Sequence, residues 1–461
     1  MRILLIPPIY QNAYQAPPDL GIGYLATALR KSKYTVFVSD CIDKRTIERR
    51  FNRELNLIKP DVVGFKLFTM DLEIAKVCFQ IVKRYNHRIK IIIGGYFPSS
   101  YQQKSLSYFP EVDFGFKGEA EIGLPLLLRY LDQPESENLS SIPGLIYRDK
   151  EKILSNPPMH LEDIDSLGFP SWDLIDPRKY NYQSYLFTKN KTVAPLVSGR
   201  GCPSRCKFCS YGAVTGKQAR VHSAKYLIDQ IKFLYKNFGV RELHFVNEHL
   251  ITNKDIFEEF CYTKIKQRLN IDWTCFCRLD TLDKRTLKLM EKSGCYSITV
   301  GIESGSRRVL EHMQKDLTIE TIREKLHLIK DNTKIMVMGT FILGYPIENQ
   351  IDIQKTIEFS KSLPLFASTF YHFFLVPGTP IYNELIAKEK PNADWSKFLW
   401  DRDPYIPNSI GYKKLKKLYQ KAYMSFYFRP KILFRILIKI RSFGNINFLI
   451  KKMIIILKKQ L

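Results

Sequence analysis

The chain has 461 residues, of which 45% are hydrophobic, and it carries a formal net charge of +25. This length allows two or three domains, and the composition excludes an intrinsically disordered protein. The nine cysteines form no disulfide framework, which excludes a secreted disulfide scaffold and indicates a reducing compartment. The opening MRILLIPP is too short for a signal peptide, and no apolar run approaches the ~18 residues that span a bilayer, so we expect a cytoplasmic protein.

Strand-like and helix-like segments alternate through the first part of the chain. The expected strands are 2–8, 35–40, 61–68, 90–95 and 112–118, and the expected helices are 19–31, 72–85 and 122–131. This alternation predicts a parallel sheet with helices on both faces, which binds ligands outside the carboxyl ends of its strands. Glycines gather at those ends, where they either let a ligand approach the backbone or form ordinary turns.

The first domain also resembles a known one. IPPIYQNAYQAPPDLGIGYLATALRKSKYTVFVSD, IIIGG and VDFGFKGEAE are similar to the cobalamin-binding domain upstream of many radical S-adenosylmethionine enzymes. The resemblance implies cobalamin contacts from Pro17, Gly64, Gly94, Gly95, Gly118 and Glu119. The chain lacks the Asp-x-His-x-x-Gly motif that supplies a histidine ligand to cobalt in some cobalamin proteins, as is usual in the radical enzymes.

Residues 133–192 are rich in Pro, Asp and Ser and are typical of a linker. Alternation then resumes, with expected strands at 194–199, 242–248, 272–278, 297–304, 335–344 and 367–376. About six strand–helix units predict a partial (β/α) barrel, in which the loops after the strands carry the chemistry.

The segment GRGCPSRCKFCS after the first of these strands places Cys202, Cys206 and Cys209 in the spacing C-x3-C-x2-C. A structural zinc takes four ligands and a disulfide takes two. Three thiolates instead hold three irons of a [4Fe–4S] cluster and leave the fourth iron open to a small molecule. A structural zinc with a distant fourth ligand is the alternative.

Together with CRLD and GIESGS, this motif resembles the radical S-adenosylmethionine (radical SAM) family over roughly residues 190–400. The resemblance implies that the open iron binds S-adenosylmethionine and that the reduced cluster cleaves it to a 5′-deoxyadenosyl radical, which abstracts hydrogen from unactivated carbon.

The same resemblance implies further contacts to S-adenosylmethionine. They are Phe208 near the adenine, Glu248 or its neighbour Asn247 at the ammonium, Arg278 at the carboxylate, Glu303 at the ribose, and Gly339 and Gly344 where the cofactor approaches the fifth strand. Each charged residue could instead be a solvated strand end. Cys261, Cys275, Cys277 and Cys295 are expected in the core.

The resemblance favours a cobalamin-dependent methyltransferase that acts on an unactivated carbon of a small-molecule, lipid or peptide substrate, with an electron donor such as flavodoxin or ferredoxin. The alternative within the family is ring closure or oxidative rearrangement without methyl transfer. A tRNA methylthiotransferase fits less well, because residues 1–190 hold only Cys41 and Cys78, too few for its second cluster. A non-catalytic iron–sulfur carrier would use four cysteines. No nucleic acid partner is expected.

Residues 404–461 carry 14 Lys or Arg and no Asp or Glu. Lys431, Arg435 and Lys439 recur every four residues, opposite Ile432, Leu433, Ile436, Leu437 and Ile440. Such a basic amphipathic helix lies in a membrane interface, at the inner face of the membrane, or packs its apolar side on the barrel. The predicted organisation is α/β: a Rossmann-like cobalamin-binding domain (1–132), a linker (133–192), a partial (β/α)6 radical SAM barrel (193–403) and a basic helical tail (404–461).

Overall fold

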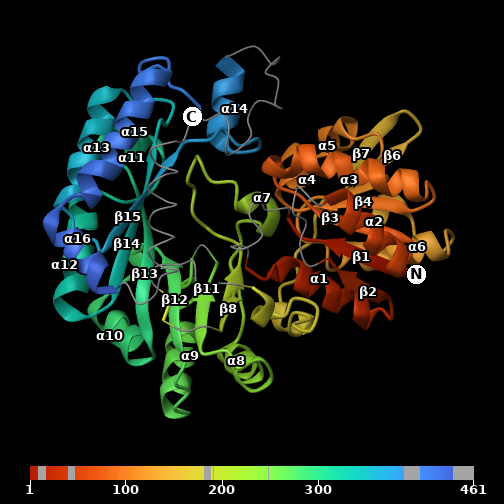
Figure 1. Cartoon of the computed structure of the whole chain (residues 1–461), viewed down its shortest axis with the longest axis horizontal. Helices are drawn as coiled ribbons and strands as arrows, with labels where there is room; N and C mark the ends of the chain where they lie inside the picture. The colour runs from red at the N-terminus through yellow and green to blue at the C-terminus, as the bar shows by residue number, and fades with distance from the viewer. Residues whose placement is uncertain are drawn as a thin grey trace.

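The computed structural model describes residues 1–8, 17–39, 47–180, 188–189, 192–247, 249–388 and 405–439 (Figure 1). Glu248, Cys41 and residues 440–461 lie outside the described residues. The chain forms two α/β bodies, an N-terminal one and a larger one, with the segment around residue 212 between them (Figure 1).

The N-terminal body is built on a seven-stranded sheet of order β2-β1-β3-β4-β5-β6-β7. Five of its strands are parallel: β1 (Arg2–Ile6), β2 (Thr35–Val38), β3 (Val62–Lys66), β4 (Lys90–Gly94) and β5 (Phe114–Phe116). α1 (Leu20–Lys31) and α6 (Gly123–Asp132) cover one face. α2 (Ile47–Ile58), α3 (Leu72–Tyr85), α4 (Tyr96–Tyr101) and α5 (Gln103–Tyr108) cover the other, and the predicted doubly wound sheet is confirmed.

Part of the predicted linker, residues 133–192, adds two strands to the N-terminal sheet. Residues 145–155 form an antiparallel hairpin, β6 (Leu145–Asp149) and β7 (Lys152–Ser155), which extends the N-terminal sheet from β5. A later, described part of the predicted linker packs against both bodies: Trp172 and Ile175 join the core of the larger body together with Leu20 and Tyr24 of α1. Gly23 allows this approach, because a Cβ there would lie 2.6 Å from the Ile175 side chain.

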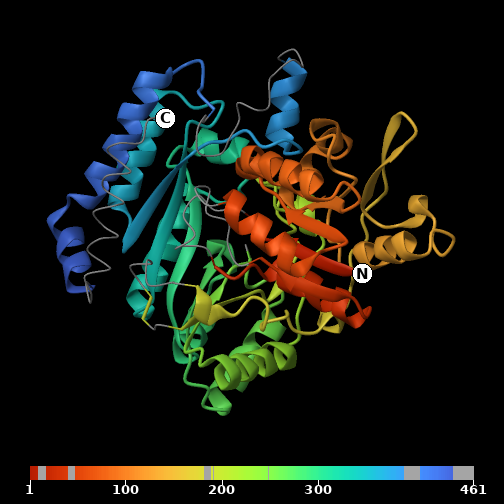
Figure 2. The same cartoon turned by 45° about the vertical axis from the view of Figure 1, so that its right-hand side comes forward.

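The larger body is a six-stranded parallel sheet of order β15-β14-β13-β12-β11-β8, which follows the chain order as a partial barrel does (Figures 1 and 2). The strands are β8 (Val193–Leu196), β11 (Glu242–Phe245), β12 (Asp272–Cys277), β13 (Cys295–Glu303), β14 (Met336–Leu343) and β15 (Ala367–His372). The helices are α8 (Ala224–Phe238), α9 (Lys254–Lys266), α10 (Lys284–Lys292), α11 (Arg307–His312), α12 (Ile319–Asn332) and α13 (Gln350–Ser362). The predicted partial barrel is confirmed.

A small clasp that the sequence did not predict interrupts the first strand–helix unit. β9 (Gly199–Arg200) pairs antiparallel with β10 (Arg220–Val221), so Arg200 and Arg220 face each other. The clasp closes a loop over residues 201–219, which we call the cysteine loop, and α7 (Gly212–Thr215) lies in it. Figure 1 shows α7 between the barrel and α4 of the N-terminal body.

Within the predicted tail, residues 404–461, α15 (Tyr412–Tyr427) packs on the barrel. It lies against β15 and α13 and buries Leu415, Tyr419, Tyr423 and Phe426. The Tyr423 hydroxyl accepts from Phe370 N (3.1 Å) and donates to Phe370 O (3.0 Å), so it satisfies the backbone of edge strand β15. α14 (Pro380–Lys388) and α16 (Pro430–Lys439) complete the described chain, in which no helix is long and apolar enough to cross a bilayer.

Candidate active site between the two bodies

The three cysteines of the C-x3-C-x2-C motif lie together on the cysteine loop, at the carboxyl end of β8. Cys202 and Cys206 are half-buried, Cys209 is exposed, and none of the three forms a disulfide bond. Cys261, Cys275, Cys277 and Cys295 are buried, which confirms their predicted place in the core.

Backbone contacts hold this loop in shape. Gly201 has φ +82°, and a Cβ there would lie 1.9 Å from Gln218 O, so only glycine fits. Cys202 N donates to Gly216 O (3.3 Å), and Lys207 N donates to Met313 O (3.0 Å). Among the described residues no three His, Cys, Asp or Glu side chains surround a point that suits a single metal ion. A [4Fe–4S] cluster does not require such a point, since each thiolate binds a different iron, and free thiols on a half-exposed loop suit that donor set.

A buried lysine that the sequence analysis missed lies beside the cysteine loop. Lys315 Nζ donates to Glu303 Oε1 at 2.7 Å and lies 5.9 Å from the centre of the Phe208 ring. Burial lowers the pKa of Lys315, but the negative charges of Glu303 and Cys206 outweigh it and raise that pKa overall. Burial raises the pKa of the Cys206 thiol, while Lys315 and Arg278 oppose that change. The lysine follows α11 outside any recognised motif, so its spacing gave no signal.

Glu303 stands at an irregular strand end. The register of β13 against β14 shifts between Gly301 and Glu303, and Glu303 takes φ +66°, a conformation that glycine favours. A Cβ on Gly301 would lie 2.2 Å from Glu303 Oε1, so this glycine makes room for the buried carboxylate. The carboxylate and the predicted adenine neighbour Phe208 therefore meet around Lys315.

Arg278 holds the cysteine loop. Its guanidinium donates to both oxygens of Asp280 (3.0 and 2.8 Å), to Ser204 Oγ (2.9 Å) and to Lys315 O (3.1 Å). Ser204 lies between Cys202 and Cys206, so Arg278 connects the end of β12 to the cysteine loop. The predicted contact of Arg278 to the carboxylate of S-adenosylmethionine would use the same guanidinium N–H groups.

The remaining residues predicted for S-adenosylmethionine do not all join the site. Asn247 is engaged within the fold: its Oδ1 accepts from Ser198 N (3.0 Å) and its Nδ2 donates to His249 O (3.0 Å). At Gly339 a Cβ would lie 2.7 Å from the Leu365 side chain, so this side of the glycine packs in the core, and its approach to the cofactor stays a prediction. Gly344 (φ +86°) shapes the turn after β14, and its N–H donates to Glu348 Oε2 (2.7 Å).

The residues predicted to contact cobalamin lie around one cavity, with one exception. Gly64 within β3, and Gly94, Gly95, Gly118 and Glu119 at or just beyond the carboxyl ends of β4 and β5, all line it, and Pro17 does not. A Cβ on Gly94 would meet no atom within 4 Å, so its open side faces free space, as a large flat ligand requires.

The opposite wall of this cavity comes from the barrel. Arg200, Tyr211, Val214 and Thr215, all on β9 or the cysteine loop, line it together with Lys66 and Tyr24 of the N-terminal body. In the described part of the chain, no histidine lines the cavity. The same loop that carries the three cysteines thus forms one wall of the predicted cobalamin site.

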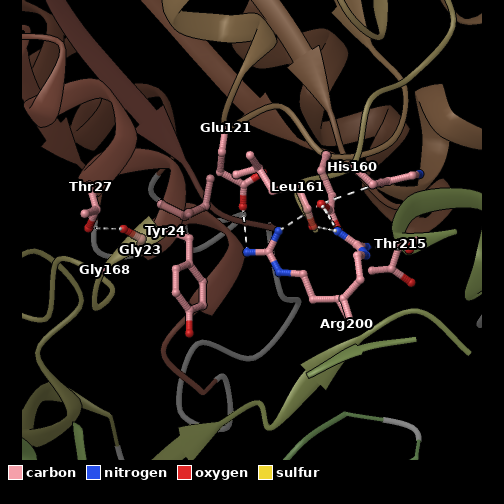
Figure 3. A network of polar contacts seen from close by, with 12 residues as sticks. Gly23, Tyr24, Thr27, Glu121, His160, Leu161, Gly168, Arg200 and Thr215 are labelled. Atoms are coloured by element: carbon pink, nitrogen blue, oxygen red, sulfur yellow. Dashed lines mark hydrogen bonds and ion pairs between the residues drawn. The ribbon is translucent and has the colours of Figure 1, made fainter. Parts of the chain in front are cut away.

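Glu119 is engaged by arginines of the barrel. Its carboxylate accepts from both terminal nitrogens of Arg220 (2.9 and 2.7 Å), and Arg200 Nη1 lies 3.4 Å away. Arg200 also donates to Glu121 (2.7 Å), the contact drawn in Figure 3. Burial raises the pKa of Glu119, but the hydrogen bonds and charges of its partners lower it to about 2. These contacts hold the Glu119 carboxylate to the two arginines, and they do not indicate a direct contact of this carboxylate with cobalamin.

Protein-family models match both bodies. The model described as B12 binding domain matches residues 8–128, and that of the radical SAM superfamily matches residues 196–360. The chain is a radical SAM enzyme with a B12-binding domain. The predicted family, fold and cofactor set are confirmed at the level of these domains, whereas the individual site residues stay predictions.

Relatives extend over nearly the whole chain. A protein of Pyrococcus horikoshii described as an uncharacterized methyltransferase is 28% identical over 98% of this chain and 97% of its own length. An anaerobic magnesium-protoporphyrin IX monomethyl ester cyclase of Rubrivivax gelatinosus is 28% identical over 78% of this chain and 66% of its own. Among solved structures, the methyltransferase TsrM of Kitasatospora setae shares the fold, with a TM-score of 0.74, 15% identity and coverage of 93% of this chain and 89% of the other.

Proposed function

We propose that this radical SAM enzyme is a cobalamin-dependent methyltransferase that acts on an unactivated carbon of a small molecule. The observation that carries the proposal is the cysteine loop, which bears the three cluster ligands and also lines the glycine-edged cavity of the B12-binding domain. Similar proteins include a cytidylyl-2-hydroxyethylphosphonate methyltransferase of Streptomyces wedmorensis, 25% identical over 80% of this chain, and two bacteriochlorophyllide d methyltransferases of Chlorobaculum tepidum.

The roles of the residues follow from their places. Cys202, Cys206 and Cys209 would hold a [4Fe–4S] cluster, and the glycines within β3 and at the ends of β4 and β5 would leave room for cobalamin. When bound, the cluster and S-adenosylmethionine supply a carbon radical, and cobalamin supplies a carrier for the methyl group. Glu303 would accept hydrogen bonds from the ribose of S-adenosylmethionine, with Lys315 holding its carboxylate in place. Arg278 would fix Ser204 and with it the cysteine loop.

The domain limits are proposed with two changes from the sequence prediction. The B12-binding domain would run to residue 155, because the β6–β7 hairpin completes its sheet. The barrel would include α15, because α15 covers β15. Residues 156–192 then remain as the linker, and the tail begins at α16.

Product analysis tests the proposed reaction. Protein purified without oxygen would be loaded with iron, sulfide and hydroxocobalamin and given S-adenosylmethionine labelled in the methyl group, a reductant and a small-molecule extract of its native host. We expect 5′-deoxyadenosine and a product that carries the label. 5′-Deoxyadenosine with an unlabelled, oxidised product would overturn methyl transfer and support ring closure, the second candidate, which the similarity to the cyclase of Rubrivivax gelatinosus favours.

We also propose that α16 contacts an anionic membrane surface. Its described part buries Ile432 (3% exposed) against the barrel core but leaves Phe434 and Ile438 65% and 63% exposed, beside Lys431 and Arg435. An apolar strip flanked by cations suits an interface with anionic lipid. A flavodoxin or ferredoxin is the electron donor that we propose for the cluster.

Vesicle sedimentation tests this contact. The double variant Phe434→Ser/Ile438→Ser should lose sedimentation with phosphatidylglycerol vesicles at low salt while its melting temperature stays within 2 °C or so of the wild-type value, because both side chains are exposed. The exposed Tyr235→Ser on α8 serves as the control. Equal sedimentation of wild type and double variant, or none by either, would contradict the proposal.

A further inference from the structure

Four charged side chains meet where the B12-binding domain touches the barrel. Glu119 and Glu121 lie on the loop between β5 and α6, and Arg200 and Arg220 lie on the β9–β10 clasp. Arg220 donates to both oxygens of Glu119, and Arg200 donates to Glu121 at 2.7 Å. Figure 3 shows Glu121 and Arg200 directed at one another beside Tyr24, whose ring lies 5.0 Å from the Arg200 guanidinium. We call these four residues the interdomain clamp.

The clamp is buried and balanced in charge. The side chains of Glu119, Glu121, Arg200 and Arg220 are 8%, 9%, 9% and 4% exposed. Two carboxylates face two guanidinium groups, so the docked state leaves no net charge inside. Buried charges are tolerated only with their partners present, so each of the four depends on the two domains remaining together.

The clamp also stands at the base of the cysteine loop. Arg200 and Arg220 are directly paired across β9 and β10, one at each end of the loop. Arg220 further donates to Thr215 O (2.7 Å) inside the loop and to Leu161 O (3.0 Å) of the linker. Both ends of the loop are thereby attached to the B12-binding domain.

The cysteine loop therefore contributes residues both to the proposed cluster site and to the wall of the cobalamin cavity. Between the two arginines lie the three cysteines, and also Tyr211, Val214 and Thr215, which form the cavity wall. We propose that the four clamp residues Glu119, Glu121, Arg200 and Arg220 are positioning residues that fix the cysteine loop against the B12-binding domain. The order of the cysteine loop and the shape of the cobalamin cavity then depend on the same contacts. The link to cobalamin rests on the proposed function, whereas the ordering of the loop does not.

Hydrogen exchange of the full chain without added cofactors tests the ordering. Glu119→Gln keeps the shape of the side chain and removes the charge that Arg220 and Arg200 face. We expect amide exchange in residues 201–219 to accelerate at least tenfold while exchange in β12 and β13 stays unchanged. Arg30→Ala, which breaks the exposed Arg30–Asp173 pair between α1 and the linker, is the matched control and should change neither region. Unchanged exchange of residues 201–219 in Glu119→Gln would overturn the clamp.

Two more variants guard against a general loss of fold. Arg220→Lys keeps the charge but loses the forked contact to Glu119, and Glu121→Gln removes a single contact of Arg200. Faster exchange confined to residues 201–219 in either variant supports the clamp. Faster exchange spread equally over both sheets would mean a merely structural role and overturn it.

The link between the sites is tested with hydroxocobalamin as the probe. Its addition should slow exchange of residues 201–219 in the wild type, and Glu119→Gln should bind it at least tenfold more weakly while retaining wild-type iron content after reconstitution. If the wild type binds no cobalamin, the proposed function fails, but the cofactor-free exchange still decides on the clamp. Equal cobalamin affinity in wild type and Glu119→Gln would contradict the proposal that the clamp shapes the cobalamin cavity through the cysteine loop.

Discussion

At the scale of single residues, the proposed chemistry depends on the spacing of Cys202, Cys206 and Cys209. Cys202→Ala, Cys206→Ala and Cys209→Ala should each abolish the cluster and the formation of 5′-deoxyadenosine, because one iron loses its thiolate. Cys275→Ala should leave both intact, since Cys275 is buried in the core away from the loop. Iron content and the absorption spectrum after reconstitution measure this. Loss of the cluster in Cys275→Ala would show that the ligands are wrongly assigned.

The residues around Lys315 lead to a second prediction. Glu303→Gln and Arg278→Ala should weaken binding of S-adenosylmethionine about 10- to 100-fold, as expected for the loss of a charge-assisted hydrogen bond worth ~1.5–3 kcal/mol. Iron content should stay near the wild-type value in Glu303→Gln, which keeps the contacts of Arg278 to the cysteine loop. Calorimetry on cluster-loaded protein measures the affinity, and Arg285→Ala is the control because that side chain is 69% exposed on α10. Wild-type affinity in both test variants would remove these residues from the cofactor site.

The sequence predicted some of these residues and missed others for a physical reason. Cys202, Glu303 and the glycines at strand ends stand in local patterns that one kind of chemistry requires. Lys315 and Arg220 act through partners that are distant in the chain, such as Glu119, 101 residues away from Arg220. No local pattern marks such a pair, so only the fold brings it into view.

At the scale of elements, the turn after β14 contains a carboxyl group that favours its neutral form. Glu348 is fully buried, and burial raises its pKa to about 8, although Gly344 N and Tyr345 N both donate to it. Because the folded state holds this proton more tightly than the unfolded state, the associated stability is present below the ordinary pKa and is lost as pH rises toward 8.

Wild-type stability relative to Glu348→Gln should therefore fall between pH 5 and pH 8, by at most about 1.4 kcal/mol per pH unit. Urea denaturation of both proteins at several pH values measures the difference. A difference in unfolding free energy that does not change with pH would mean that Glu348 is charged in the folded protein.

Helix α15 supplies the next prediction, because its tyrosines satisfy the edge of the barrel sheet. Tyr423→Phe leaves Phe370 N and O without their partner and should cost about 1–3 kcal/mol of unfolding free energy. Tyr235→Phe, at a side chain that is 44% exposed, should be neutral. Equal stability of both variants in denaturant titrations would show that α15 does not stabilise β15.

Two elements that the sequence analysis did not predict, the β6–β7 hairpin and the packing of α15, were missed for the same reason. The β6–β7 hairpin turns at Asp149–Lys150–Glu151–Lys152 without a glycine, although Lys150 takes φ +53°, so the polar turn resembled a linker. Residues 412–427 are rich in lysine on their exposed side, and the burial of Leu415 and Phe426 appears only once β15 is in place. In both segments, tertiary packing determines which domain the segment joins, and amino-acid composition alone does not reveal this.

At the scale of the whole molecule, the cysteine loop of the barrel also lines the cavity of the B12-binding domain. The cavity lined by Gly64, Gly94 and Gly118 offers no histidine among the described residues. Cobalamin bound to the full chain should therefore show no axial nitrogen splitting from a protein histidine in the electron paramagnetic resonance spectrum of its Co(II) form. Such a splitting would mean that a histidine reaches the cobalt and that the cavity is wrongly assigned.

In the proposed enzyme, the cluster and cobalamin bind in the same chain, on either side of the cysteine loop. Pulsed electron paramagnetic resonance tests it most directly, by measuring the dipolar interaction between the Co(II) of bound cobalamin and the reduced cluster in the reconstituted full-length protein. We predict one narrow distance distribution in the wild type, and none in Cys206→Ala, which should still bind cobalamin. A wild-type protein that binds both cofactors without any mutual dipolar interaction would contradict this arrangement of the two sites.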